Sequence, residues 1–293
     1  MQISYNKLKT FNECALKYRF TYVERLPRPP IASLAFYRRL HTALANYHFL
    51  AKRDGVVRQE ELLHAYAESW DVVRNPEVRE TKIFQEGEEI LRRYSQTEQE
   101  KGRIPVYLER SLHVPFGPYV LTGKVDRIDF AENDQYSIID YKLDRKPPSV
   151  DAADVSEQLS FYLLLVSEGL GMTIQDVRLY FLRHGIERIS VPDKARKRET
   201  IDWIDTTANN IHKERRWEPC AGPGCKTCAF QSVCPEKTGQ SRPNQTVWQQ
   251  GNLMWEMQAE RGGEAVVANS LASTADESET TASPKQMTLE DYL

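Results

Sequence analysis

The chain has 293 residues, of which 40% are hydrophobic and 28% are charged. This composition is typical of a globular protein and excludes a low-complexity chain. No apolar run approaches the ~20 residues of a membrane span, and the first residues lack the apolar core of a secretory signal. We therefore expect a cytoplasmic protein without a membrane segment, in which the five cysteines are reduced.

The net charge of −3 is unevenly distributed along the chain. Residues 241–293 contain eight acidic and three basic residues, a charge of −5, which leaves +2 for residues 1–240. Basic clusters stand at residues 38–39, 194–198 and 213–216. Each cluster is compatible with phosphate binding and also with an ordinary solvated helix face. The acidic total therefore does not exclude a protein that binds nucleic acid.

The first part of the chain shows helical periodicity. Apolar residues repeat at helical spacing in four stretches, and the prolines between residues 27 and 30 separate the first stretch from the second. Ser4 is suited to cap the first helix. These patterns predict helices over residues 4–23, 33–53, 59–74 and 79–99.

The periodicity then changes to that of strands. Alternation predicts a strand over 106–114, ending near Pro115, and a pair of strands joined by a polar turn at 131–135. A helix, another strand pair and a charged helix follow. The order predicts an α/β fold with a mixed central sheet flanked by helices, after a helical N-terminal part. The later elements are expected at 119–130, 136–143, 154–168, 176–183, 186–191 and 196–216.

Residues from about 240 onward differ in composition from the rest. The stretch 268–285 is rich in Ser, Thr, Ala and Glu and has no periodicity, which is typical of disorder. We therefore expect residues 1–240 to form one folded domain and residues 241–293 to form a disordered acidic tail.

The central predicted hairpin carries three residues suited to metal-dependent chemistry. Alternation along a strand puts Asp140 and Lys142 on one face. A turn centred on Asn133 places Asp126 opposite Asp140, with Cβ atoms ~4.5–5.5 Å apart. Two carboxylates this close require a cation, and Mg²⁺ or Mn²⁺ would suit them, while Lys142 could orient an attacking water. The alternative is a simple Asp–Lys ion pair on a hairpin.

Three further polar residues accompany the hairpin. Gln158 and Tyr162 share one face of the following helix, at i and i+4, and His41 lies on an early helix. With Gly-Lys-Val-Asp-Arg-Ile-Asp at 123–129 and Ile-Ile-Asp-Tyr-Lys at 138–142, they resemble the RecB-like branch of the PD-(D/E)XK nucleases. This branch includes the CRISPR-associated iron–sulfur nucleases and the AddB helicase–nuclease subunit. The opening segment is similar as well, and the resemblance spans about residues 3–237.

The resemblance implies a site and a reaction. Asp126, Asp140 and His41 would be metal ligands, Lys142 the catalytic lysine, and Gln158 and Tyr162 would shape the site and contact DNA. The implied activity is Mg²⁺- or Mn²⁺-dependent hydrolysis of DNA, as an exonuclease on single-stranded ends, in repair, recombination or replication. One alternative is a CRISPR adaptation nuclease that trims DNA before integration. Another is a non-catalytic DNA-binding scaffold with the same fold.

Two positions depart from the family pattern. The family often has glycine four residues before the histidine, where this chain has Tyr37, and proline after its first cysteine, where this chain has Ala15. Tyr37 leaves open the interpretation of His41 as a helix-surface histidine. Glu109, on the strand before the hairpin, could join the metal site or lie on the surface.

Cys225, Cys228 and Cys234 place three thiolates in a short loop. Thiolates are soft ligands suited to iron–sulfur clusters or zinc. Spacing alone favours Cys220 as the fourth ligand and a zinc knuckle. The family resemblance instead implies Cys14 and a 4Fe–4S cluster that holds the two ends of the domain together. Structural free cysteines are a third alternative.

The last eight residues read Gln-Met-Thr-Leu-Glu-Asp-Tyr-Leu. They fit the pattern of peptides that bind the sliding clamp PCNA. One helical turn would bring Leu289, Tyr292 and Leu293 together as an apolar plug, with Gln286 bonding to nearby backbone. The preceding polar stretch would serve as a tether. The sequence thus predicts a sliding clamp as a partner in addition to single-stranded DNA; the alternative is an apolar C-terminus without function.

Overall fold

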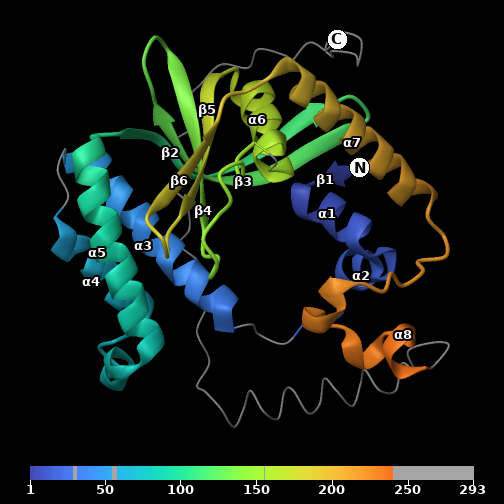
Figure 1. The fold of residues 1–293 in the computed structure, drawn as a ribbon, viewed down its shortest axis with the longest axis horizontal. Helices are drawn as coiled ribbons and strands as arrows, with labels where there is room; N and C mark the ends of the chain where they lie inside the picture. The colour runs from blue at the N-terminus through green and yellow to red at the C-terminus, as the bar shows by residue number, and fades with distance from the viewer. Residues whose placement is uncertain (29–31, 55–57, 155, 240–293) are drawn as a thin grey trace, which may run out of the picture. The chain divides into compact units, whose positions relative to one another are not determined.

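A computed structural model describes residues 1–28, 32–54, 58–154 and 156–239 (Figure 1). The chain divides into two compact units. The first, here called the sheet unit, comprises Met1–Lys9 and Pro30–Glu214. The second, here called the cysteine unit, comprises Thr10–Pro29 and the chain from Arg215 onward. Within the described part of the chain, none of the helices combines the length and apolar character needed to span a bilayer.

The sheet unit is built on a six-stranded mixed sheet, as predicted. The strand order is β1-β3-β4-β5-β6, and β2 pairs with β3. Pairing is parallel between β1 and β3 and between β4 and β5, and antiparallel elsewhere. The parallel pair β4–β5 requires a crossover, which α6 (Glu157–Leu170) supplies. The strands are β1 (Gln2–Ile3), β2 (Ile104–Phe116), β3 (Tyr119–Phe130), β4 (Gln135–Lys142), β5 (Thr173–Phe181) and β6 (Ile186–Ser190).

Helices flank this sheet (Figure 1). Helix α6 packs against β2, β3, β4 and β5, and α7 packs on α6. Helices α3, α4 and α5 pack on one another, and α3 also contacts β2. These helices are α3 (Ala32–Asp54), α4 (Gln59–Ser69), α5 (Lys82–Lys101) and α7 (Lys194–Lys213). The remaining helices are α1 (Tyr5–Glu13) and, in the cysteine unit, α2 (Ala15–Tyr18) and α8 (Pro235–Thr238).

An aromatic-rich core joins α3, α4 and α5 to the sheet. Leu40 and Tyr66 from the helices are completely buried, and Tyr94 is 1% exposed. From the strands, Tyr141 and Tyr180 belong to the same cluster. Since burying a large side chain stabilises a protein by roughly 1.5–3 kcal/mol, this cluster anchors β4 firmly through Tyr141.

The β3–β4 hairpin has the register that the polar turn predicts. Asn133 and Asp134 have positive φ angles of 54° and 56°, a conformation that Asn and Asp tolerate better than most residues. Arg127 pairs with Ile139 at the far end of the ladder. The next residues on each strand are Asp126 and Asp140, where the ladder stops.

The predicted helix over residues 4–23 is wrong in one respect, because it is interrupted at Cys14. Helix α1 ends at Glu13, and Cys14 has an extended backbone with φ −169° and ψ 116°. Its sulfur accepts a hydrogen bond from Lys17 N at 3.4 Å, so Cys14 caps α2 instead of continuing α1. A π-helical turn, Arg19–Val23, follows. The short strand β1 was not predicted, since two residues are too few to show alternation.

Candidate active site

A cavity of about 500 Å³ in the sheet unit collects polar side chains from six helices and strands, namely α1, α3, β2, β3, β4 and α6. His41 comes from α3, Asp126 from β3 and Asp140 from β4, while Gln158 and Tyr162 come from α6. These are five of the six residues predicted from the sequence for the nuclease site. The sixth, Lys142, lies beside the cavity and contacts two of its lining residues, Asp140 and Gln158.

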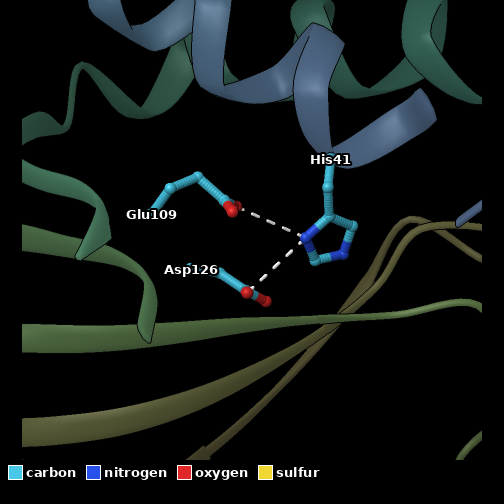
Figure 2. Close-up of side chains that lie close together, drawn as sticks. All are labelled: His41, Glu109 and Asp126. Atoms are coloured by element: carbon cyan, nitrogen blue, oxygen red, sulfur yellow. Dashed lines mark ion pairs between the residues drawn. The ribbon is translucent and has the colours of Figure 1, made fainter. Parts of the chain in front are cut away.

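His41, Glu109 and Asp126 form a compact group of potential ligands (Figure 2). The Nδ1 atom of His41 lies 3.5 Å from Oε1 of Glu109 and 3.5 Å from Oδ1 of Asp126. The three ligand atoms all lie within 4.8 Å of one another. His41 is only 7% exposed, so it is not a helix-surface histidine. Imidazole nitrogen and carboxylate oxygen are donors that fit a divalent metal ion.

The carboxylates change the protonation of His41. Burial alone would lower the pKa of His41, but the hydrogen bonds and negative charges of Asp126 and Glu109 outweigh it and raise the pKa to about 9. Conversely, burial would raise the pKa of Glu109, yet His41 and Lys124 hold it below its ordinary value. The positive charges of His41 and Lys124 therefore balance the carboxylates of Glu109 and Asp126, which is the role that a bound metal ion would take.

Glu109 is the candidate metal ligand whose role the sequence left undecided. It lies in β2 between Leu108, which pairs with Arg127, and Arg110, which pairs with Val125, so it stands opposite Asp126. Its φ angle of 50° is in the left-handed region, which is strained for a residue with a side chain and is enriched at functional sites. Strand alternation could not reveal this conformation, which accompanies the approach of the carboxylate to His41.

Asp126 takes part in backbone pairing where the β3–β4 ladder ends. Its Oδ2 accepts a hydrogen bond from Tyr141 N at 3.0 Å, in place of the missing strand-to-strand bond. Its other oxygen faces His41. The carboxylate of Asp126 thus contacts both β4 and α3. These two contacts fix the position of Asp126 relative to Asp140.

Asp140 is a buried carboxylate with incomplete partners. It is 2% exposed, forms an ion pair with Lys142 at 2.5 Å, and accepts a hydrogen bond from Gln158 Nε2 at 3.0 Å. Burial raises its pKa above the ordinary value despite the opposing charge of Lys142, and the charge of Asp126 adds to the rise. A bound cation would relieve this cost of burying an anion.

Lys142 belongs to a chain of hydrogen bonds that leads to α6. Its Nζ donates to Gln158 Oε1 at 2.6 Å, and Gln158 Nε2 donates to the Tyr162 hydroxyl at 3.1 Å. Gln158 and Tyr162 meet because they are one helical turn apart. The amide of Gln158 therefore bonds to both Lys142 and Tyr162, and it orients the ammonium of Lys142 next to Asp140.

Comparison with known proteins identifies the family. The model of the PD-(D/E)XK nuclease superfamily matches residues 2–235. The chain belongs to this superfamily. Nucleases of this superfamily use divalent metal ions, and the group of His41, Glu109 and Asp126 could bind one.

Two solved structures show a distant similarity to this chain. A protein from Eubacterium rectale, named provisionally as an exonuclease, is 13% identical with a TM-score of 0.47, over 78% of this chain and 86% of that one. A protein named SSO0001 is 15% identical with a TM-score of 0.35, over 70% of this chain and 96% of that one. No curated protein matches the sequence.

The cysteines of the nuclease meet at a second cavity, of about 380 Å³, in the cysteine unit. Cys14 lines it together with Cys220, Cys225, Cys228 and Cys234, although it lies 206 residues before Cys220. Cys14 Sγ accepts a hydrogen bond from Cys220 N at 3.4 Å. The structure therefore brings both predicted candidates for the fourth ligand to the same cavity.

Two features separate the cysteines from one another. Cys220 is exposed, whereas the other four are partly buried. Cys14, Cys228 and Cys234 also pack against a small apolar cluster. That cluster consists of Leu16, Phe20, Phe230 and Val233.

The predicted clamp-binding residues of the nuclease, Gln286, Leu289, Tyr292 and Leu293, lie outside the described residues. The same holds for the acidic tail at 241–293.

Proposed function

We propose that this protein is a RecB-like deoxyribonuclease that depends on Mg²⁺ or Mn²⁺ and degrades DNA from single-stranded ends. One observation carries the proposal. His41, Glu109 and Asp126 place three ligand atoms within 4.8 Å of one another, and Asp140 with its partner Lys142 lies in the same site. A chain of a nuclease superfamily thus keeps both a metal-binding group and a positioned lysine.

Asp126, Asp140, Glu109 and His41 would hold the metal ion. When bound, the ion supplies positive charge to the scissile phosphate and lowers the pKa of a bound water. Oxygen ligands predominate in this set, which favours hard ions such as Mg²⁺ or Mn²⁺ over softer ones. The carboxylates and the imidazole hold this charge in place, and the strand and helix backbones fix the distances between them.

Lys142 would act on the reacting groups directly. Gln158 holds its ammonium at 2.6 Å, so the lysine is directed instead of free to rotate. A positioned cation can orient the attacking water and stabilise the negative charge that develops on the phosphate. Tyr162, held by the same amide at 3.1 Å, would shape the site and contact the substrate.

The lining of the cavity supports the proposal of a single-stranded substrate. Tyr5, Tyr37 and Tyr162 all line it, together with the exposed Arg38. Aromatic faces bind unstacked bases by ~1–3 kcal/mol each, and basic groups bind the backbone. In a base-paired duplex the bases are stacked on one another and cannot make this contact with aromatic side chains. This difference supports a preference for single strands.

A panel of end-labelled substrates tests this proposal. Linear single-stranded DNA, the same strand in a blunt duplex, the equivalent RNA and circular single-stranded DNA are each incubated with Mg²⁺ or Mn²⁺. We expect degradation of linear single-stranded DNA alone, with the circle as the matched control without an end. Cleavage of the circle would show endonuclease action. Intact DNA in every reaction would overturn the proposed activity.

We further propose that Cys14, Cys225, Cys228 and Cys234 bind a 4Fe–4S cluster. These four are partly buried around one cavity, and Cys220 is exposed. A cluster at these residues would join the first segment of the cysteine unit, which carries Cys14, to its second segment, which carries Cys225, Cys228 and Cys234.

Two matched cysteine variants test the cluster. Protein purified without oxygen should be brown and contain iron and sulfide. Cys14→Ser should lose iron and thermal stability, whereas Cys220→Ser should keep both. Zinc in place of iron, or iron loss only in Cys220→Ser, would contradict this ligand set.

For residues 241–293 we propose a tether that ends in a sliding-clamp peptide, which would recruit the nuclease to replication or repair. The support is the Gln-led apolar pattern of residues 286–293 after a long polar stretch. A short peptide that becomes ordered on binding should have an affinity on the order of micromolar. Calorimetry with the host's own clamp tests it, with Tyr292→Ala/Leu293→Ala peptide as control. Absence of heat at high micromolar peptide would exclude the clamp.

A further inference from the structure

Tyr37 contacts the candidate metal ligand His41 directly. It stands four residues earlier on α3, so the two side chains share one helix face. Their ring centroids are 3.9 Å apart, with the planes inclined by 40°. Tyr141 meets the same imidazole edge-on, at 5.5 Å and 89°. The imidazole is thus packed between a tyrosine from its own helix and a tyrosine from β4.

This packing replaces a missing hydrogen bond. A metal-binding histidine usually donates its second ring N–H to a carboxylate, carbonyl or water, which fixes the ring orientation. In His41, Nδ1 faces Glu109 and Asp126, while the buried Nε2 has no hydrogen-bond partner among the described residues. Glu109 and Asp126 therefore hold the Nδ1 side of the ring, whereas its other side is held by aromatic neighbours.

The hydroxyl of Tyr37 reaches the other side of the site. It donates a hydrogen bond to the backbone carbonyl oxygen of Tyr141 at 3.4 Å. That carbonyl belongs to the peptide that joins Tyr141 to Lys142. At 3.4 Å the bond is long for an O–H donor, so the hydroxyl should contribute less than the ring.

We infer that Tyr37 is a positioning residue of the metal site. Its ring fixes the imidazole of His41 for a divalent cation, and its hydroxyl fixes the β4 backbone that carries Lys142. The inference rests on the proposed metal-dependent function and names a residue where the family resemblance led us to expect glycine. The two roles are separable, because one acts on metal binding and the other on the placement of the lysine.

Two variants separate the ring from the hydroxyl. Tyr37→Leu keeps much of the volume but removes the aromatic face, and we expect the Kd for Mn²⁺ to rise about tenfold, the low end for groups that support a metal ligand. Tyr37→Phe keeps the ring, and its Kd for Mn²⁺ should stay within about twofold of wild type. Calorimetric titration of the purified full chain with Mn²⁺ alone, without DNA, measures both. Tyr47→Phe is the matched control: it removes another buried tyrosine hydroxyl from α3, away from the cavity.

Kinetics at saturating Mn²⁺ give the second readout. Tyr37→Phe should lower kcat by about threefold with KM unchanged, because only the position of Lys142 is affected. Tyr37→Leu should recover to the kcat of Tyr37→Phe when Mn²⁺ is raised well above its increased Kd. A purely structural role would lower the melting temperature without this recovery.

The outcomes are distinct from those that test the proposed function. If wild type binds no Mn²⁺ and cleaves no DNA, the proposed function fails. If wild type does both, and Tyr37→Leu binds Mn²⁺ with the same Kd, the positioning role of Tyr37 is overturned alone. An equal loss of Mn²⁺ affinity in Tyr47→Phe would also overturn it, by showing that a change in α3 away from the cavity has the same effect.

Discussion

Neighbouring residues of the β3–β4 hairpin enter two polar environments that differ in how completely they are satisfied. Side chains alternate along a strand, so Asp126 and Arg127 point to opposite sides, as do Asp140 and Tyr141. Asp126 and Asp140 reach the cavity of the candidate active site. Arg127 and Tyr141 enter a buried network with α5.

Arg127, at the centre of the buried network, is satisfied by its neighbours. Arg127, 1% exposed, forms a two-pronged ion pair with Asp129 at 2.5 and 2.6 Å and a second ion pair with Glu98 at 2.6 Å. It also donates to the Tyr94 hydroxyl at 2.9 Å, and that hydroxyl lies 2.6 Å from the hydroxyl of Tyr141. The guanidinium therefore has a partner for each of its nitrogens.

The cavity side leaves its polar atoms incomplete. The buried Nε2 of His41 has no hydrogen-bond partner among the described residues, and Oδ2 of Asp140 has only its ion pair with Lys142. Buried polar groups are usually satisfied, and an unsatisfied one requires an explanation such as an ion. The comparison teaches that a saturated buried network stabilises the fold, whereas an unsaturated one indicates a site for a ligand.

The largest expected effect is on activity, from a change on the cavity side. Asp140→Asn should lower metal-dependent DNA cleavage by about 10³-fold, because it removes a charge that, under the proposed function, holds the cation. It should leave the free energy of unfolding unchanged or raise it by about 1 kcal/mol. The reason is that burial raises the pKa of Asp140, which means that its ionised form opposes folding at neutral pH.

Cleavage rates and urea unfolding of the metal-free protein check this pair of results. A large loss of stability in Asp140→Asn would break the comparison, since it would place Asp140 among the residues that hold the fold together.

A change on the network side should have the opposite consequence. Arg127→Met should reduce the free energy of unfolding by about 3–5 kcal/mol, because the buried Glu98 and Asp129 would lose the hydrogen bonds that Arg127 donates. They would keep only the ion pairs with Arg103 and, for Glu98, with Lys101. Arg110→Met, which alters an exposed arginine of β2, should change it by less than about 0.5 kcal/mol. Chemical denaturation measures both. Equal stability of the two variants would show that the buried ion pairs contribute nothing.

His48 should make the network sensitive to acid. Arg127 donates to His48 Nε2 at 2.8 Å, so this nitrogen must be unprotonated. Burial, followed by the charges of Arg127 and Arg103, holds the pKa of His48 well below its ordinary 6.5. The unfolded chain therefore binds a proton below pH ~6.5 that the folded protein rejects, and stability should fall by up to about 1.4 kcal/mol per pH unit as pH decreases.

The pH dependence of unfolding between pH 7 and 5 checks this smaller effect. His48→Gln, which cannot titrate, should flatten the loss, whereas His64→Gln, on the exposed surface of α4, should not. The raised pKa of Asp140 shifts stability in the opposite direction, but it does so equally in wild type and in His48→Gln. The same pH dependence in wild type and His48→Gln would therefore contradict a neutral His48.

Sequence patterns predicted much of the hairpin. The polar turn and strand alternation predicted the register in which Arg127 pairs with Ile139, and so the neighbouring positions of Asp126 and Asp140. Helical spacing predicted that Gln158 and Tyr162 share a face, and they are joined by a hydrogen bond. Local periodicity was sufficient in these cases because the positions depend on one turn or one helix.

Other features depend on contacts that no local pattern contains. The left-handed backbone of Glu109 appears only where β2 lies against β3 and α3. The burial of Arg127 depends on α5, and an arginine between two aspartates in a strand also fits an exposed position. The interruption at Cys14 was missed because apolar spacing continues through it.

The measurement that tests the central claim most directly is Mn²⁺-dependent cleavage of end-labelled single-stranded DNA by two matched lysine variants. Lys142 contacts Asp140 and Gln158, whereas Lys124, 56% exposed at the rim of the same cavity, pairs with Glu109. We predict that Lys142→Ala abolishes cleavage while the free energy of unfolding and the binding of Mn²⁺ are retained. Lys124→Ala should retain cleavage within about tenfold of wild type. Full activity in Lys142→Ala would contradict the assignment of this cavity as the nuclease site.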